Sequence, residues 1–115
     1  MEKDYSIYIF DIAESINLIE SYVAGMSQVD FLNNAAIRDA VVRRVEIIGE
    51  AAKRIPGTMK NRYKDIAWKA ITGTRDRLIH DYGDVDFTGV WEIVKNDLPL
   101  LKNQMKKIIK QEGYK

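Results

Sequence analysis

Apolar residues recur among polar ones along the first 25 positions with the spacing that is typical of an amphipathic helix. The apolar positions recur every three or four residues, which places them on one stripe of a helix with 3.6 residues per turn. They are Tyr5, Tyr8, Ile12, Ile16, Ile19 and Val23. We expect Asp4 to cap this helix and Gly25 to end it, because glycine readily adopts positive φ beyond a helix C-terminus.

A second stripe of the same period predicts a second long helix. Its members are Ile37, Val41, Val45, Ile48, Ala52 and Ile55. Asn33 or Asn34 is the expected cap, and Pro56 ends the helix because its ring clashes with the preceding turn. Gly49 and the neighbouring alanines are small, so we expect another element to approach this helix closely.

The segment 58–64 is interpreted as one helical turn or a structured loop. A third helix is then predicted from Asp65, its expected cap, to about Tyr82. Gly73 lies in the middle of this helix, where a glycine costs about 0.5–1 kcal/mol relative to alanine. We interpret it as a point where another backbone or a ligand comes close.

A fourth helix is predicted after Asp86, its expected cap, because apolar residues recur at spacings of three and four from Phe87 to Ile108. Pro99 lies inside this run and predicts a kink. No segment alternates with the period of a strand, and neither Asn-Gly nor Asp-Gly occurs as a hairpin turn. The four patterns together predict an all-α fold, a four- to five-helix antiparallel bundle.

The composition narrows the class of protein. A length of 115 residues with 46% hydrophobic content fits one domain, residues 1–115, with a basic tail at about 102–115. No apolar run reaches the roughly 18 to 20 residues of a membrane span, and the acidic N-terminus differs from the basic start of a signal peptide. The chain has no cysteine and one histidine, which excludes disulfides and a multi-histidine metal site within one protomer. We expect a cytoplasmic protein that uses no metal or cofactor.

Charge is segregated along the chain, although the formal net charge is only +1. Residues 1–30 contain one lysine against six acids, whereas residues 38–77 contain 11 bases against five acids. This segregation permits a basic surface that attracts phosphates. It is equally consistent with acidic and basic helices that pair within the fold. Trp68 and Trp91 fall on helical stripes, which favours core anchoring over stacking on bases.

The densest polar segment contains the only histidine, His80, together with Arg75, Asp76 and Tyr82. Histidine transfers protons near neutral pH, and arginine stabilises charge on phosphate oxygens. On one continuous helix Arg75 and His80 lie about 140° apart around the axis, so one protomer makes a poor catalytic pair. A purely structural interpretation stays open, with His80 near a helix C-terminus and the charged residues on a solvated face.

The spacing Arg75-x4-His80-x-Tyr82 resembles the R-x4-H-x-Y signature of the HEPN superfamily, specifically its HepT-like branch. The flanking sequences at 36–53, 68–73 and 90–99 are also similar to that branch, so the resemblance covers nearly the full chain. It implies a small helical bundle that forms a homodimer. Its interface cleft would gather the arginine and histidine of both protomers.

The resemblance also implies an activity, namely metal-independent cleavage of RNA by the toxin of a type VII toxin–antitoxin pair. Arg75 would then bind the scissile phosphate and His80 would transfer protons, with Gly73 and Asp76 as supporting residues. The cognate antitoxin would be a minimal nucleotidyltransferase that silences the toxin by adding AMP to Tyr82.

One position departs from the superfamily pattern. Asp76 stands where asparagine is frequent, and its carboxylate would repel RNA phosphate while favouring protonated His80. The alternative function is a non-catalytic HEPN module that binds a nucleotidyltransferase partner or nucleotides.

Overall fold

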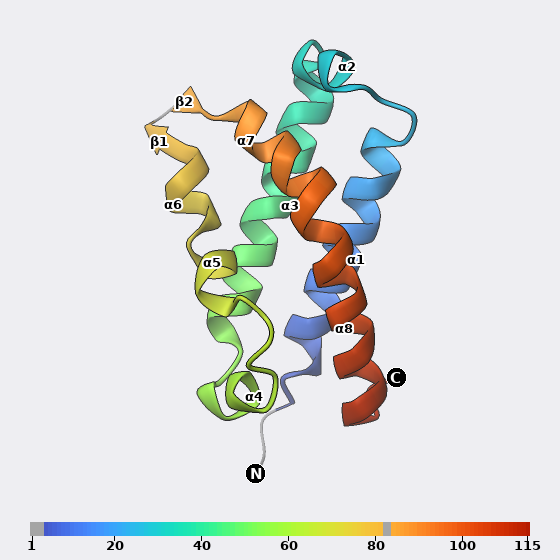
Figure 1. The fold of residues 1–115 in the computed structure, drawn as a ribbon, viewed down its shortest axis with the longest axis vertical. Helices are drawn as coiled ribbons and strands as arrows, with labels where there is room; N and C mark the ends of the chain where they lie inside the picture. Colours follow the sequence, from blue (N-terminus) through green and yellow to red (C-terminus); the bar gives the residue numbers. More distant parts are fainter. Residues whose placement is uncertain (1–3, 82–83) are drawn as a thin grey trace.

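Three long helices form the centre of the molecule in a computed structural model, which describes residues 4–81 and 84–115. They are α1 (Ser6–Val23), α3 (Ala35–Arg54) and α8 (Leu98–Glu112). Helix α1 packs against both α3 and α8. The chain runs up through α1, down through α3, up through α5 and α6, and down through α7 and α8 (Figure 1). The antiparallel course expected from the helical stripes is therefore present.

Shorter elements complete this arrangement. Helix α2 (Gln28–Leu32) connects α1 to α3 along the chain at one end of the bundle, and α4 (Gly57–Arg62) lies at the opposite end (Figure 1). Along α3 pack α5 (Trp68–Thr72) and α6 (Thr74–Leu78), followed by strands β1 (Ile79–Asp81) and β2 (Asp84–Val85). Helix α7 (Phe87–Glu92) leads through a π-helical turn, η1 (Ile93–Asp97), into α8. None of the described helices has the length and apolarity needed to cross a bilayer.

The first two predicted helices are confirmed, together with most of their end signals. Helix α1 ends at Val23, and Gly25 has a φ of +75°. Asp4 Oδ1 accepts a hydrogen bond from the Ser6 amide at 2.9 Å, although Tyr5 occupies the N-cap position. Asn34 caps α3 by accepting from the Ile37 amide at 3.0 Å.

The small residues of α3 allow a close approach, as predicted. A Cβ added to Gly49 would lie 3.6 Å from the Ile71 carbonyl oxygen, so the backbone of α5 passes directly over this point. The tryptophans belong to the core. The Trp68 indole donates to the Tyr63 carbonyl at 3.0 Å, and the Trp91 ring packs 5.2 Å from Phe31 between ring centroids.

The third helix differs from its prediction in three ways. Helix α5 begins at Trp68 without a described side-chain cap, so Asp65 does not cap it. The helix is interrupted at Gly73, and it ends at Leu78 rather than near Tyr82. The chain then forms a two-stranded antiparallel hairpin, which the sequence did not predict. Pairing across the hairpin ends the helix, because the Leu78 carbonyl accepts from the Asp86 amide at 2.8 Å.

At Gly73 the expected close approach of another backbone is absent among the described residues, whereas the approach of a ligand stays a prediction. The Gly73 φ of −87° is open to any residue, and the nearest atom to an added Cβ is the Lys69 carbonyl oxygen, at 3.2 Å. Crowding therefore comes from the preceding turn of the same chain, and among the described residues no other segment or backbone approaches this position.

Pro99 lies inside a helical run that continues from Phe87 to Glu112, as the sequence indicated, and the predicted kink there stays a prediction. The π-helical turn η1 precedes it, and the proline falls in the first turn of α8. The Leu98 amide donates to the Ile93 carbonyl, five residues earlier, so the helix widens locally beside the proline, and such π-turns are a known source of helix kinks. The predicted cap of this region is confirmed, since Asp86 Oδ1 accepts from the Gly89 amide at 3.0 Å.

Two polar contacts hold the long helices to their neighbours. Lys102 Nζ lies 2.7 Å from Glu20 Oε1 and joins the lysine-rich helix α8 to the acidic helix α1, so part of the segregated charge pairs within the fold. At the α4 end, the buried Tyr63 hydroxyl donates to Glu112 Oε2 at 2.7 Å. Burial, as the larger cause, and this hydrogen bond to a carboxylate, as the next, raise the pKa of Tyr63 to about 12.

Candidate functional site

The R-x4-H-x-Y segment is divided between a helix and a hairpin. Arg75 and Asp76 lie on α6, whereas the backbone of His80 belongs to β1. The His80 side chain and the whole of Tyr82 are outside the described part of the chain. The helical relationships expected from the sequence therefore do not apply, because His80 follows the end of α6 instead of continuing it.

Gly89 is important for this geometry and was missed by the analysis of the sequence. A Cβ at Gly89 would lie 2.8 Å from Leu78 Cδ2 and 2.6 Å from Asp86 Oδ2. A side chain at this position would require the ends of the Leu78 and Asp86 side chains to shift, so glycine suits the close approach of α7 to the end of α6. The available signal was its position three residues after Asp86, in the first turn of the predicted helix.

Arg75 lies between two carboxylates. Its Nε is 3.5 Å from Glu46 Oε2 on α3, and its Nη1 is 3.8 Å from Asp76 Oδ1. Both distances exceed those of formed N–H···O hydrogen bonds, so the contacts are mainly Coulombic. The Arg75 side chain is 49% exposed, which leaves its guanidinium accessible to an anionic ligand. Glu46 was not singled out from the sequence, because it lies 29 positions from Arg75.

The second arginine of α6 has a structural environment. Arg77 Nη2 donates to the Ala70 carbonyl and to Thr74 Oγ1, both at 3.2 Å. Thr74 Oγ1 in turn donates to the same carbonyl at 2.8 Å. These bonds bridge the interruption at Gly73 and fix α6 relative to α5. Arg75 is therefore the arginine of α6 that is better suited to bind a substrate.

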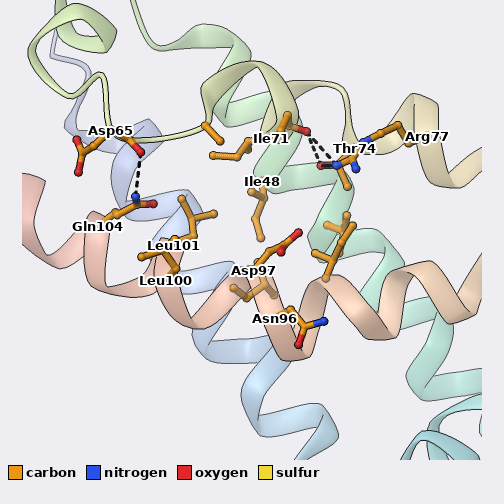
Figure 2. Close-up of a pocket in the computed structure, with 15 residues that line it drawn as sticks. Ile48, Asp65, Ile71, Thr74, Arg77, Asn96, Asp97, Leu100, Leu101 and Gln104 are labelled. Carbon is orange, nitrogen blue, oxygen red and sulfur yellow. Dashed lines mark hydrogen bonds between the residues drawn. The ribbon is translucent and has the colours of Figure 1, made fainter.

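A partly enclosed groove of about 290 Å³ lies between α3, α5 and α6 on one side and η1 and α8 on the other. Figure 2 shows its apolar wall, which includes Ile48, Ile71 and Leu101, and the polar groups of Asn96 and Asp97 at its edge. From α6, Thr74 and Arg77 line the groove but Arg75 does not. This groove is thus distinct from the surroundings of Arg75.

No set of three or more metal-binding side chains is grouped within the part of the chain that the structure describes. The described charged groups in contact with the Arg75 guanidinium are the carboxylates of Glu46 and Asp76. The guanidinium itself suits the binding and electrostatic stabilisation of an anion, with His80 as the nearest proton-transfer residue in the sequence.

Comparison with known proteins gives a consistent result. A family model described as "Ribonuclease HepT-like" matches residues 12–108. The "Probable ribonuclease HepT" of Thermococcus cleftensis is 41% identical over 96% of this chain and 100% of its own length. The "Putative RNase MJ1216" of Methanocaldococcus jannaschii is 41% identical over 95% of this chain and 90% of its own. No solved structure gives a significant match.

A further relative is longer. The "Gamma-glutamylcyclotransferase and putative RNase MJ0434" of Methanocaldococcus jannaschii is 44% identical over 96% of this chain, which spans only 50% of that protein. The resemblance noted from the R-x4-H-x-Y motif is confirmed by the family match and by relatives that align over almost all of the sequence. The chain therefore belongs to the ribonuclease HepT-like family.

Proposed function

We propose that this protein is a metal-independent endoribonuclease that cleaves RNA by attack of the RNA's own 2′-hydroxyl. The 2′-oxygen forms a bond to the adjacent phosphorus, and the bond from phosphorus to the 5′-oxygen breaks. The products are a 2′,3′-cyclic phosphate and a 5′-hydroxyl. The observation that carries this proposal is the R-x4-H-x-Y motif in a chain of the ribonuclease HepT-like family, with the Arg75 side chain half exposed.

Arg75 binds the scissile phosphate and stabilises the charge that develops on its oxygens. His80 transfers protons, either from the 2′-hydroxyl or to the departing 5′-oxygen. Each protomer supplies one histidine, whereas the reaction needs both a base and an acid. A homodimer whose cleft combines Arg75 and His80 of both protomers meets this requirement.

Tyr82 is the proposed regulatory residue. A minimal nucleotidyltransferase antitoxin adds AMP to its hydroxyl, and the new phosphate charge occupies the position that RNA phosphate needs. The protein then acts as the toxin of a toxin–antitoxin pair in the cytoplasm. This part of the proposal is supported by the family relationship and by the position of Tyr82 two residues after His80.

The test compares four proteins on mixed RNA in EDTA: wild type, Arg75→Ala, His80→Ala and Arg54→Ala. Arg54 is an exposed arginine at the end of α3 and controls for the loss of one positive charge. Cleavage by wild type and Arg54→Ala, with loss of cleavage in the other two, supports the proposal. Equal cleavage by all four proteins contradicts it. Sedimentation at micromolar concentration tests the homodimer, and a monomer there would count against the shared cleft.

One observation favours the second candidate function, a HEPN module that binds nucleotides or a nucleotidyltransferase without cleavage. Glu46 and Asp76 both lie within 4 Å of the Arg75 guanidinium and partly neutralise the charge that RNA phosphate requires. Binding of RNA or nucleotide by wild type, without any product in the cleavage assay, would support this alternative.

A further inference from the structure

The ion pair between Arg75 and Glu46 connects the motif to one of the long helices. Glu46 lies on α3 between Val45 and Ile48, which are buried in the core. Its carboxylate contacts the Nε edge of the guanidinium at 3.5 Å. The other carboxylate near Arg75, that of Asp76, comes from the adjacent residue of the five-residue helix α6.

Exposure distinguishes the two carboxylates. The Glu46 side chain is 30% exposed, whereas that of Asp76 is 80% exposed. Solvent and salt screen the Asp76 contact more strongly, and an exposed aspartate changes rotamer readily. Glu46 is therefore the more effective of the two in restricting where the Arg75 guanidinium lies.

The edge that Glu46 contacts also matters. A guanidinium presents its five N–H donors in a rigid planar fork. A carboxylate beside Nε leaves the Nη1/Nη2 end of the guanidinium with only the exposed Asp76 carboxylate near it, 3.8 Å from Nη1, so this end can still bind two phosphate oxygens at once. We infer that Glu46 is a positioning residue that holds Arg75 with this end directed at the scissile phosphate. The inference rests on the proposed ribonuclease function and extends it to a residue outside the motif.

The size of the expected effects makes this inference testable. A partly exposed ion pair contributes little to the stability of a fold, so Glu46→Gln is expected to fold normally. A small misplacement of a catalytic group, in contrast, can slow a reaction by up to about 100-fold. We expect Glu46→Gln to lower kcat about tenfold with little change in KM, because the guanidinium still binds phosphate but is oriented less well when charge develops.

The matched control is Glu50→Gln. Glu50 lies one turn further along α3, and its carboxylate pairs with Lys53 at 3.6 Å instead of with Arg75. The two variants therefore remove the same charge from the same helix. Equal kcat in Glu46→Gln and wild type, or an equal loss in both glutamine variants, would overturn the inference.

A second measurement does not depend on cleavage. The order of the Arg75 Nε–Hε group can be followed by ¹⁵N relaxation, with the signal assigned from its loss in Arg75→Lys. We expect a less ordered group in Glu46→Gln and an unchanged one in Glu50→Gln. If Glu46→Gln leaves this order unchanged, the positioning role is wrong, whatever the RNA assay shows. If the order falls but wild type cleaves no RNA, Glu46 positions Arg75 and the ribonuclease proposal is the part that fails.

Discussion

Gly89 and Leu78 touch at the junction between α7 and the end of α6, where an added methyl group would lie 2.8 Å from Leu78 Cδ2. We expect Gly89→Ala to lower the free energy of unfolding by about 1 kcal/mol, because the ends of the Leu78 and Asp86 side chains must shift to admit the methyl group. Urea denaturation measures this. Gly57→Ala is the control, since a Cβ there meets nothing within 4 Å. Equal stability of the two variants would show that the junction is not tightly packed.

Ser15 provides a stabilising substitution. Its side chain is fully buried in α1, and its hydroxyl has no hydrogen-bond partner among the described residues. An unsatisfied buried hydroxyl is costly and alanine is the better helix former, so Ser15→Ala is expected to raise stability by about 1 kcal/mol. Thermal denaturation is the measurement, with Ser21→Ala as the comparison.

The exposed Ser21 hydroxyl on the same helix donates to the Leu18 carbonyl at 2.7 Å. Because this hydroxyl is exposed, water can replace the lost hydrogen bond at the Leu18 carbonyl. The Ser21→Ala substitution therefore reports mainly the change in helix propensity. A loss of stability in Ser15→Ala would mean that the Ser15 hydroxyl has a partner in solution.

Tyr63 predicts a loss of stability at alkaline pH. Its pKa is raised from 10 to about 12 in the folded protein, first by burial and then by the hydrogen bond to Glu112. Between these two values the unfolded chain loses the phenol proton while the folded chain retains it. The free energy of unfolding must therefore fall as pH rises from 10 to 12, by up to about 1.4 kcal/mol per pH unit, and this contribution is constant below pH 10.

Tyr63→Phe removes this titration. Urea denaturation of both proteins at pH 9, 10 and 11 isolates the effect, since the two proteins differ only in this phenol group. We expect the stability difference between wild type and Tyr63→Phe to shrink above pH 10. A constant difference across the series would contradict the raised pKa.

Asp76 is expected to weaken RNA binding. Its carboxylate lies 3.8 Å from Arg75 Nη1 and is 80% exposed, so it repels an approaching phosphate without contributing much to the fold. Asp76→Asn is predicted to lower KM for RNA about two- to threefold at low ionic strength, an effect that decreases with added salt. Steady-state kinetics at 20 and 300 mM salt (roughly a fourfold change in Debye length) test this, and an increase in KM would assign Asp76 a supporting contact instead.

Local signals explain why the sequence predicted much of the fold correctly. The Asn34 and Asp86 caps each bond an amide three residues further along the chain, so the few residues that decide them are adjacent. Most members of the apolar stripes of α1 and α3 are buried in the core, whereas Tyr5, Tyr8 and Ile37 are half-buried. These features depend on helical geometry alone and not on the rest of the molecule.

The errors in prediction occurred where distant residues decide the structure. Helix α6 ends at Leu78 because its carbonyl bonds the Asp86 amide, eight residues later. Residues 74–82 contain neither glycine nor proline, so the sequence favoured a helix that continues to Tyr82. The contact between Glu46 and Arg75 likewise depends on how α6 packs on α3, which spacing within either segment cannot show.

The end of α6 at Leu78 changes what the five-residue separation of Arg75 and His80 means. On a continuous helix, that number would set an angle of about 140° around the axis. In this structure the separation gives only the number of backbone residues between the two side chains. It sets no angle, because His80 follows Ile79, which pairs with Val85 in the hairpin. The arginine is located by α3 and the histidine backbone by the residues that precede α7. The two halves of the motif can therefore be displaced independently by substitutions in different parts of the chain.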